Sequence, residues 1–217
     1  MPHKHLTWFQ QSAYRWDGDG PTIYIDPWGV PDEAPTADVV FITHAHSDHF
    51  SFEDLAKIRA DGTRFVAPRD IANDLSGKVT AVRPGDSIDV GGVSGQAVHA
   101  YNNVEGRLGH HPKANGWVGY VLTLGDATYY HAGDTDHVPE LEAVKAQVAL
   151  LPIGGTYTMN VDEAARLAKS IAPEVAIPMH YGGFFPGVGA EADGEAFKEK
   201  AAPVRVELLT PVNPFVE

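Results

Sequence analysis

Short apolar runs separated by Gly, Pro and Asp follow one another along the chain, and this pattern predicts many short strands. Near the N-terminus, two such runs flank the turn-forming stretch Asp17–Pro21 and predict a hairpin. The next run, 37–42, is apolar at nearly every position, which is typical of a strand covered on both faces. A short helix is expected over 51–59, because Ser51 and Asp54 have the spacing of a helix N-cap pair.

Further strands are predicted in the middle of the chain, at 65–67, 79–82, 93–100, 118–124 and 127–131. The last two face each other across the two-residue turn Gly125–Asp126. In the last third, helices at 138–147, 161–171 and 191–201 alternate with strands at 148–153, 174–180 and 204–209. This alternation indicates layered sheets with helices outside, and no linker interrupts it, so we expect a single α/β domain over residues 1–217.

Composition and charge restrict the function. The length of 217 residues fits one domain, and an apolar fraction of 43% is ordinary for a soluble protein. The lack of cysteine excludes disulfides, thiolate metal sites and cysteine nucleophiles. A net charge of −13 disfavours nucleic acid and anionic membranes as partners. With neither a signal peptide nor a transmembrane stretch in the pattern, we expect a cytoplasmic protein that acts on a small molecule; a homo-oligomer is compatible with the sequence.

The densest group of chemically active residues follows the buried strand 37–42. It reads His44-x-His46-x-Asp48-His49 and precedes a helix, so it lies at the carboxyl end of a strand, where open α/β sheets bind ligands. In an extended loop, positions 44 and 46 point to one side and can hold one ion, while Asp48 and His49 can face a second. Imidazole and carboxylate suit zinc, and iron or manganese less selectively. The alternative is a solvated polar loop.

Other ligand candidates also follow predicted strands. His99 ends one strand, Asp134 follows another within Ala-Gly-Asp-Thr, and His180 ends a late apolar strand. The rivals of His99 are His110 and His111, which lie on a loop with Gly and Pro and look more like pocket or surface residues. Asp134 could instead be an ordinary turn aspartate.

These motifs together resemble the metallo-β-lactamase superfamily. The resemblance is carried by Thr43–His49, Ile25–Pro27, His99, His131–Thr135 and Pro178–Tyr181, which occur in the family's order. A closer likeness is to the small metal-dependent hydrolases that include the ascorbate-phosphate lactonase-like proteins, which share the segment His131–Thr135 and the stretch Leu151–Met159.

The resemblance implies an αββα four-layer sandwich with two metal ions at one edge. It assigns His44, His46 and His99 to the first ion, Asp48, His49 and His180 to the second, and Asp134 to both. Such a ligand set leaves an open position for water, as catalytic sites do. Asp48 would also orient the attacking hydroxide and shuttle a proton.

Several residues outside this set are expected to support it. Asp26 and His131 are candidates to orient a ligand or a loop from behind. Substrate contacts or leaving-group protonation are assigned to His110, His111, Tyr157 and Tyr181. Gln11 stands where many relatives carry histidine, and it cannot act as an acid or an imidazole-type ligand. The stretch Gly154–Met159 is expected to line the pocket; a phosphate loop is the weaker alternative because it lacks lysine.

The expected activity is hydrolysis by a metal-bound hydroxide, with an ester, lactone or phosphodiester as substrate. The binuclear site would hold two divalent ions, zinc foremost, with manganese or iron as alternatives. β-Lactam hydrolysis is less favoured, because fold does not fix substrate. Two rival hypotheses stay open: a di-iron redox protein of the same fold, and a metal-dependent binding protein without catalysis.

Overall fold

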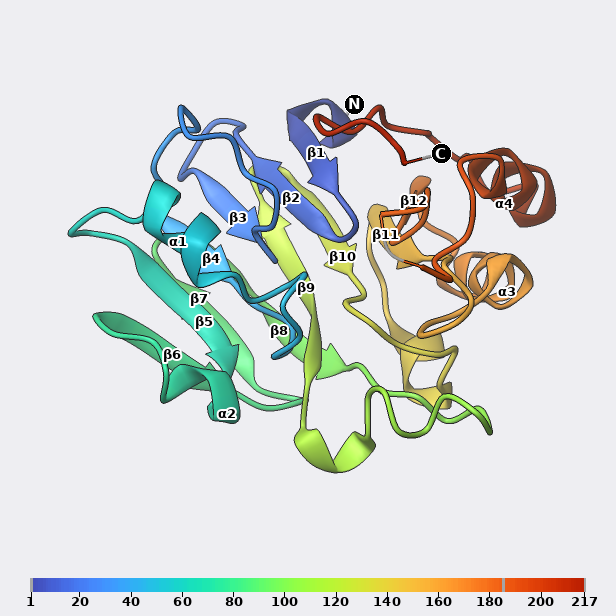
Figure 1. The fold of residues 1–217 in the computed structure, drawn as a ribbon, viewed down its shortest axis with the longest axis horizontal. Coiled ribbons are helices and arrows are strands. Elements are labelled where there is room, and N and C mark those ends of the chain that lie inside the picture. The colour runs from blue at the N-terminus through green and yellow to red at the C-terminus, as the bar shows by residue number, and fades with distance from the viewer. Residues whose placement is uncertain (1, 185, 217) are drawn as a thin grey trace.

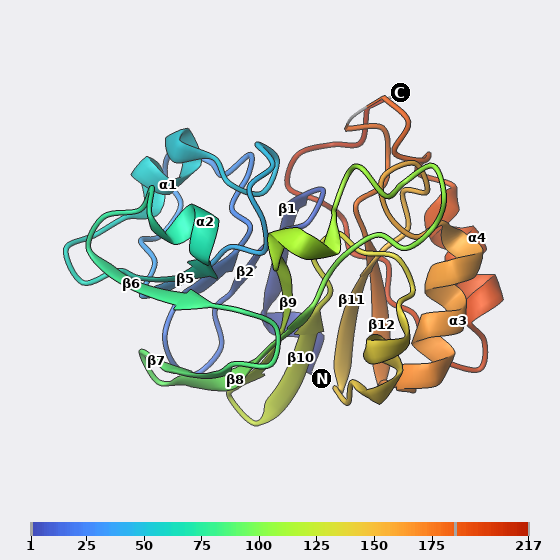
Figure 2. The same ribbon diagram turned by 90° about the horizontal axis from the view of Figure 1, so that it is seen from below.

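The computed structural model describes residues 2–184 and 186–216. In it, two six-stranded sheets pack face to face and helices cover their outer faces (Figure 1 and Figure 2). α1 and α2 lie beside the first sheet, and α3 and α4 lie beside the second (Figure 2). This is the αββα four-layer sandwich that the sequence predicts.

The first sheet has the strand order β1-β2-β3-β4-β5-β6. Its strands are β1 (Leu6–Gln10), β2 (Ala13–Trp16), β3 (Ile23–Ile25), β4 (Val39–Phe41), β5 (Arg64–Pro68) and β6 (Lys78–Val82). β1 to β3 run antiparallel to one another, and β3 to β6 run parallel.

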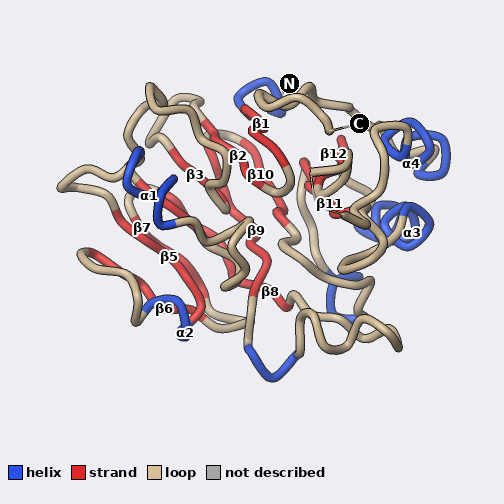
Figure 3. Tube along the Cα trace, in the orientation of Figure 1, coloured by secondary structure: helices blue, strands red, loops and turns tan. Residues whose placement is uncertain are grey.

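The second sheet has the order β12-β11-β10-β9-β8-β7. Its strands are β7 (Ser87–Val90), β8 (Val93–His99), β9 (Val118–Leu124), β10 (Ala127–His131), β11 (Val148–Pro152) and β12 (Val175–Met179). β7 to β10 are antiparallel, and β10 to β12 are parallel (Figure 3 shows both sheets in red). β9 and β10 form the hairpin predicted across Gly125–Asp126.

The helices follow the sequence signals closely where caps are present. They are α1 (Phe52–Ile58), α2 (Arg69–Ala72), α3 (Val161–Ile171) and α4 (Asp193–Ala201), with 3₁₀ helices at Pro2–His5, Lys113–Asn115 and Pro139–Ala143. Ser51 caps α1, and Asn160 and Glu163 form a reciprocal capping box at α3, so both begin where predicted. Among the described residues, no helix has the length and apolarity needed to cross a bilayer.

Neighbouring residues of one strand enter different cores, because side chains alternate across a strand. Trp8 packs between the two sheets, whereas Phe9 packs between the first sheet and its helices, and each is 1% exposed. In β4, Phe41 enters the inner core and Val40 the outer core. Burying each such side chain contributes about 1.5–3 kcal/mol. The apolar character of 37–42 therefore reflects two cores on its two faces.

The N-terminal hairpin has one turn more than the sequence predicts. The stretch Asp17–Pro21 does connect antiparallel strands, β2 and β3. A second, tighter turn at Gln11–Ser12 divides the preceding apolar run into β1 and β2. Gln11 has φ 45°, a left-handed conformation that few non-glycine residues adopt. The pattern gives no sign of this turn, since neither residue is Gly or Pro.

One predicted helix in the last third of the chain is shorter than expected. In place of a helix over 138–147 there is only the 3₁₀ helix Pro139–Ala143. Its buried residues Val138, Leu141 and Val144 recur every third position, the period of a 3₁₀ helix.

The strand expected over 204–209 is reduced to a single bridge between Val206 and Ala176. From there the chain crosses to the first sheet. Val212 donates its N–H to the Trp8 carbonyl at 2.8 Å, and Asn213 donates to the Phe9 carbonyl at 3.0 Å. The segment thereby covers the otherwise unpaired edge of β1.

Candidate metal centre

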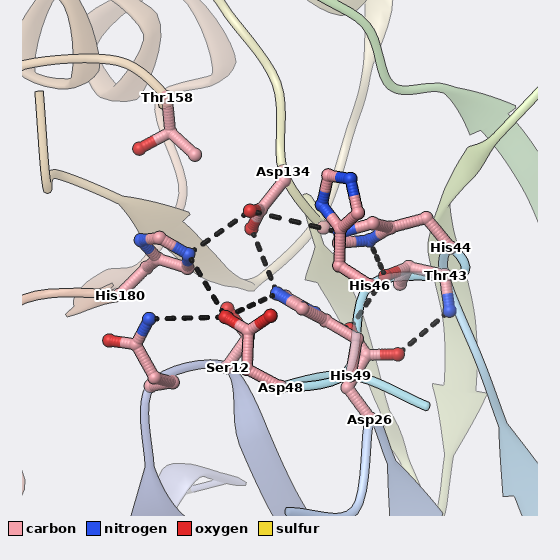
Figure 4. Close-up of polar contacts among 12 residues, drawn as sticks. Ser12, Asp26, Thr43, His44, His46, Asp48, His49, Asp134, Thr158 and His180 are labelled. Carbon is pink, nitrogen blue, oxygen red and sulfur yellow. Dashed lines mark hydrogen bonds and ion pairs between the residues drawn. The ribbon is translucent and has the colours of Figure 1, made fainter. Parts of the chain in front are cut away.

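The carboxyl ends of β4, β10 and β12 bring the predicted site residues together at one edge of the sandwich. His44 to His49 follow β4, Asp134 follows β10, and His180 follows β12. The β1–β2 turn joins them, because the carbonyl of Gln11 accepts the N–H of His180 at 3.0 Å. Figure 4 shows the side chains converging on Asp134.

The side chain of Asp26 fixes the conformation of the loop after β4. Its fully buried carboxylate accepts the Thr43 N–H at 2.7 Å and the Thr43 hydroxyl at 2.6 Å. The same carboxylate lies 2.7 Å from Nδ1 of His49 (Figure 4). The contact predicted for Asp26, to the outer nitrogen of a motif histidine, is therefore present, and it directs Nε2 of His49 toward Asp134.

The first group of donor atoms comprises His44, His46 and His111, whose ligand atoms lie within 4.8 Å of one another. The Thr43 hydroxyl lies 2.9 Å from Nδ1 of His44. Asn102 Oδ1 lies 2.8 Å from Nδ1 of His111. Both contacts leave Nε2 to face the cluster.

The second group comprises Asp48, His49 and His180, again within 4.8 Å of one another. Asp48 Oδ2 lies 3.4 Å from Nε2 of His49 and 3.7 Å from Nε2 of His180. The amide of Gln11 donates to the same oxygen at 3.3 Å.

Asp134 lies between the two groups. Its carboxylate oxygens are 3.0 Å from Nε2 of His180 and 3.4 Å from Nε2 of His49, on the side of the second group. On the other side they are 3.3 Å from Nε2 of His111 and 3.9 Å from Nε2 of His44. One buried carboxylate thus contacts both groups, as the predicted shared ligand requires.

The prediction that His99 joins the first group is wrong. His99 ends β8 as expected, but it lines a separate cavity with Gln96 and Glu140, and its ring centroid lies 5.9 Å from that of Tyr101. His111 occupies the place instead. The loop that follows β8 doubles back on itself, because Asn102 donates its backbone N–H to the His111 carbonyl at 2.8 Å. The two residues that close this loop are nine positions apart, in a segment without a repeating pattern. The sequence therefore gives no local signal that His111 reaches the site.

Several polar atoms that face the centre of the cluster are buried without hydrogen-bond partners. Nε2 of His49, Nε2 of His111 and Oδ1 of Asp134 all lack one within the described structure. Buried polar groups in folded proteins are normally paired, so such a convergence needs an explanation. Imidazole nitrogens and a carboxylate oxygen that face one another fit divalent cations of the zinc, manganese or iron type.

The charges of the cluster also favour a bound cation. Burial alone would raise the pKa of Asp134, but the neighbouring His180 and His49 hold it well below its usual range. Burial would lower the pKa of His49, yet Asp134, Asp48 and Asp26 raise it well above the ordinary value. Burial, reinforced by His49, keeps the pKa of His44 well below its ordinary value. Three carboxylates around His49 therefore create a place that favours positive charge.

Strained backbone is concentrated here. Gln11 (φ 45°), Asp26 (φ 48°) and His180 (φ 57°) are in the left-handed region, and the fourth described non-glycine residue there, Ala172, ends α3. Such conformations persist where the surrounding structure over-determines them, and they gather at functional sites.

A cavity of about 310 Å³ opens beside the cluster. It is lined by Gln11, His46, Ser47, Asp48, His110, His111, Asp134, Tyr157, His180 and Val188. His110 and Tyr157, two of the residues predicted to contact substrate, are both in its wall. The stretch Gly154–Met159 contributes Tyr157, and Gly154 lies so close to His180 that a Cβ would meet its carbonyl oxygen at 2.5 Å.

Of two further predicted residues, Tyr181 lies away from the site and His131 lies behind it, as expected. Tyr181 is not at this cavity: it is buried, its ring stacks on Trp8 at 5.6 Å, and it lines a different cavity near the C-terminal segment. His131 lies behind the site, where Nδ1 accepts the N–H of Gly133 at 3.2 Å and so supports the backbone before Asp134.

Known proteins share this architecture. Residues 5–180 match the family model described as "Beta-lactamase superfamily domain". UPF0173 metal-dependent hydrolases of Aeropyrum pernix and Methanopyrus kandleri are each 35% identical to this chain and cover 95% of it, with 94% and 96% of their own lengths matched.

Solved structures agree. A metal-dependent hydrolase from Parabacteroides distasonis has a TM-score of 0.82 and 28% identity, and the match covers 94% of this chain and 91% of that one. A metallo hydrolase from Ignicoccus hospitalis has a TM-score of 0.77 and 30% identity, covering 95% and 94%. The narrower likeness to the ascorbate-phosphate lactonase-like proteins stays a prediction. The chain belongs to the beta-lactamase superfamily and, within it, to a family of metal-dependent hydrolases.

Proposed function

We propose that the protein binds two divalent cations, zinc foremost, and hydrolyses a small ester, lactone or phosphodiester. The observation that carries the proposal is the position of Asp134 between two groups of three donors, with atoms of both groups within 3.0–3.9 Å of its oxygens. His44, His46 and His111 would hold one ion, and Asp48, His49 and His180 the other. When bound, such ions polarise the scissile group and lower the pKa of a coordinated water, to about 7 with zinc.

The residues behind the donors give them fixed directions. Asp26 and Asn102 accept from the outer ring nitrogens of His49 and His111, which leaves each Nε2 as a ligand atom. Fixed donors need no rearrangement as charge develops during reaction, and this preorganisation is a main source of catalytic rate.

Asp48 is the residue best placed to handle the proton of the attacking water. It lies at the cavity wall, and the Gln11 amide and Nε2 of His49 hold its Oδ2. The charge of His49 keeps the pKa of Asp48 below its usual range, against the effect of burial. Asp48 therefore stays ionised and can accept a hydrogen bond from water at neutral pH.

His110 and Tyr157 would contact the rest of the substrate. Both line the cavity, and neither belongs to the two donor groups. Either could donate a hydrogen bond to the leaving oxygen, since hydroxyl and imidazole groups do so in general acid catalysis.

The test combines metal content with activity. The purified protein is loaded with zinc, manganese or iron, its metal content is measured, and an ester, a lactone and a phosphodiester are supplied. Two ions per chain with turnover are expected, and Asp134→Asn should lower turnover at least about 100-fold. Asp126→Asn, in the exposed β9–β10 turn, is the matched control and should change neither. Metal binding with oxygen consumption and no hydrolysis would favour the redox alternative and contradict the proposal.

A further inference from the structure

Outside the donor groups, the cavity wall combines the polar residues Gln11 and Ser47 with one aromatic and apolar face made of His110, Tyr157 and Val188. The rings of His110 and Tyr157 meet edge to face, with centroids 4.8 Å apart and planes at 89°. Val188 completes this wall and is 1% exposed. Its backbone forms a bridge with Gly155, so the segments that carry Tyr157 and Val188 are tied together. This wall offers a substrate van der Waals contact and ring faces.

Arg107 is only three residues before His110 in the sequence, but it does not line the cavity. Its guanidinium is buried and binds the carboxylate of Glu163 at 2.6 and 2.9 Å. Its Nε lies 3.1 Å from Asp136 Oδ1. It also donates to the carbonyl oxygens of Gly155 and Thr158. All three nitrogens of the guanidinium thus bind groups of the protein itself.

Lys113, the other cation of this loop, is turned away as well. Its ammonium lies 2.7 Å from Glu140 and 4.5 Å from the centre of the Tyr101 ring. Glu140 lines the separate cavity that contains His99. The two positive charges nearest in sequence to the cavity are therefore both neutralised outside it.

Away from the two donor groups, the cavity offers no fixed cationic side chain. Asp48 and Asp134 in its wall would be occupied by the two cations, and no Lys or Arg is among the residues found to line it in the described parts of the chain. An anionic group outside the reacting centre would lose its hydration there without gaining a fixed counter-charge, which is unfavourable. The cavity volume of about 310 Å³ restricts the substrate to a small molecule.

We propose that the substrate carries no charge outside its reacting centre, and that its non-reacting part is a short alkyl or aryl group packed against His110, Tyr157 and Val188. This rests on the proposed hydrolysis and narrows it: substrates with a carboxylate or phosphate group away from the scissile bond are disfavoured.

The experiment compares two γ-lactones of nearly equal shape, one with an isopropyl group at the γ-carbon and one with a carboxylate there. Hydrolysis is followed by proton release with the metal-loaded protein, and a diaryl phosphate diester is the third substrate. We expect kcat/KM for the isopropyl lactone to exceed that for the carboxylate lactone at least about tenfold. Equal or faster hydrolysis of the carboxylate lactone would overturn the inference while leaving hydrolase function intact. Turnover of none of the three would contradict the proposed function itself.

Two substitutions test the wall directly. Tyr157→Ala should raise KM for the isopropyl lactone more than for unsubstituted γ-butyrolactone, whereas Tyr157→Phe should keep the preference, because it keeps the ring. Ser47 is exposed at the cavity rim, so Ser47→Arg should shift the ratio of kcat/KM toward the carboxylate lactone at least about tenfold, and uncharged Ser47→Gln should not. Unchanged preference in both Tyr157→Ala and Ser47→Arg would reject the inferred subsite.

Discussion

Asn102 holds His111 at both the backbone and the ring. Its Oδ1 accepts the His111 backbone N–H at 3.0 Å and lies 2.8 Å from Nδ1, and its Nδ2 donates to the carbonyl of Tyr157 at 3.0 Å. An acceptor at Nδ1 fixes the ring tautomer that leaves Nε2 free to bind a cation. Asn102 therefore connects the candidate ligand His111 with Tyr157 in the cavity wall.

Asn102→Ala should lower the affinity for one of the two ions about 10–100-fold, because the His111 ring loses its orientation. The measurement is competition with a chromophoric zinc chelator. Asn103→Ala is the matched control, since this neighbouring side chain is exposed. If both variants bind zinc like the unmodified protein, Asn102 has no positioning role.

His111→Ala should lose a bound metal ion, whereas His99→Ala should not. Removing His111 deletes a donor 3.3 Å from Asp134, so metal content should fall from two ions to one and the cobalt-loaded protein should change its visible spectrum. His99 lines another cavity, so His99→Ala should retain both ions. The reverse result would restore the ligand set that the sequence alone implied.

The difference between these two histidines shows what could be read from the sequence. His44, His46 and His49 follow a buried strand directly, so strand geometry alone places them at the sheet edge. His111 is delivered by a loop whose two ends meet through Asn102, and contacts between positions nine residues apart in irregular structure have no periodicity to detect.

The same reasoning applies to the fold. α3 was predictable to the residue because its capping box and apolar spacing are local signals. The segment at 204–209 has the composition of a strand, but it pairs with β12 only at Val206, and the chain then leaves to bind the edge of β1 through Val212 and Asn213. The turn at Gln11 depends on positive φ at a non-glycine residue, a conformation that tertiary packing imposes and the local sequence does not signal.

Gly154→Ala should weaken binding of the ion assigned to Asp48, His49 and His180. The added methyl would stand 2.5 Å from the His180 carbonyl oxygen and 3.1 Å from its Nδ1, so His180 must move. Overpacking of this kind costs about 1–3 kcal/mol of stability. Metal titration and urea unfolding measure the two effects. Gly109→Ala meets no heavy atom within 4 Å and should leave metal binding and stability unchanged.

Arg107→Met should destabilise the protein by about 3–5 kcal/mol, because it leaves the buried carboxylate of Asp136 and the partly buried carboxylate of Glu163 without their cation. Urea unfolding at neutral pH measures this loss, and the exposed Arg166→Met is the control.

The pH dependence of unfolding separates this ion pair from simple packing. Burial would raise the pKa of Glu163, but Arg107 and the N–H of Asn160 hold it below the ordinary value. A carboxyl with a depressed folded pKa contributes stability above its unfolded pKa of about 4.3, and that contribution disappears as pH falls through the folded pKa. The gap in unfolding free energy between the unmodified protein and Glu163→Gln should therefore be widest near pH 7 and shrink below about pH 4. A gap that stays constant from pH 7 to pH 3 would mean that the glutamate contributes through its shape and not through its charge.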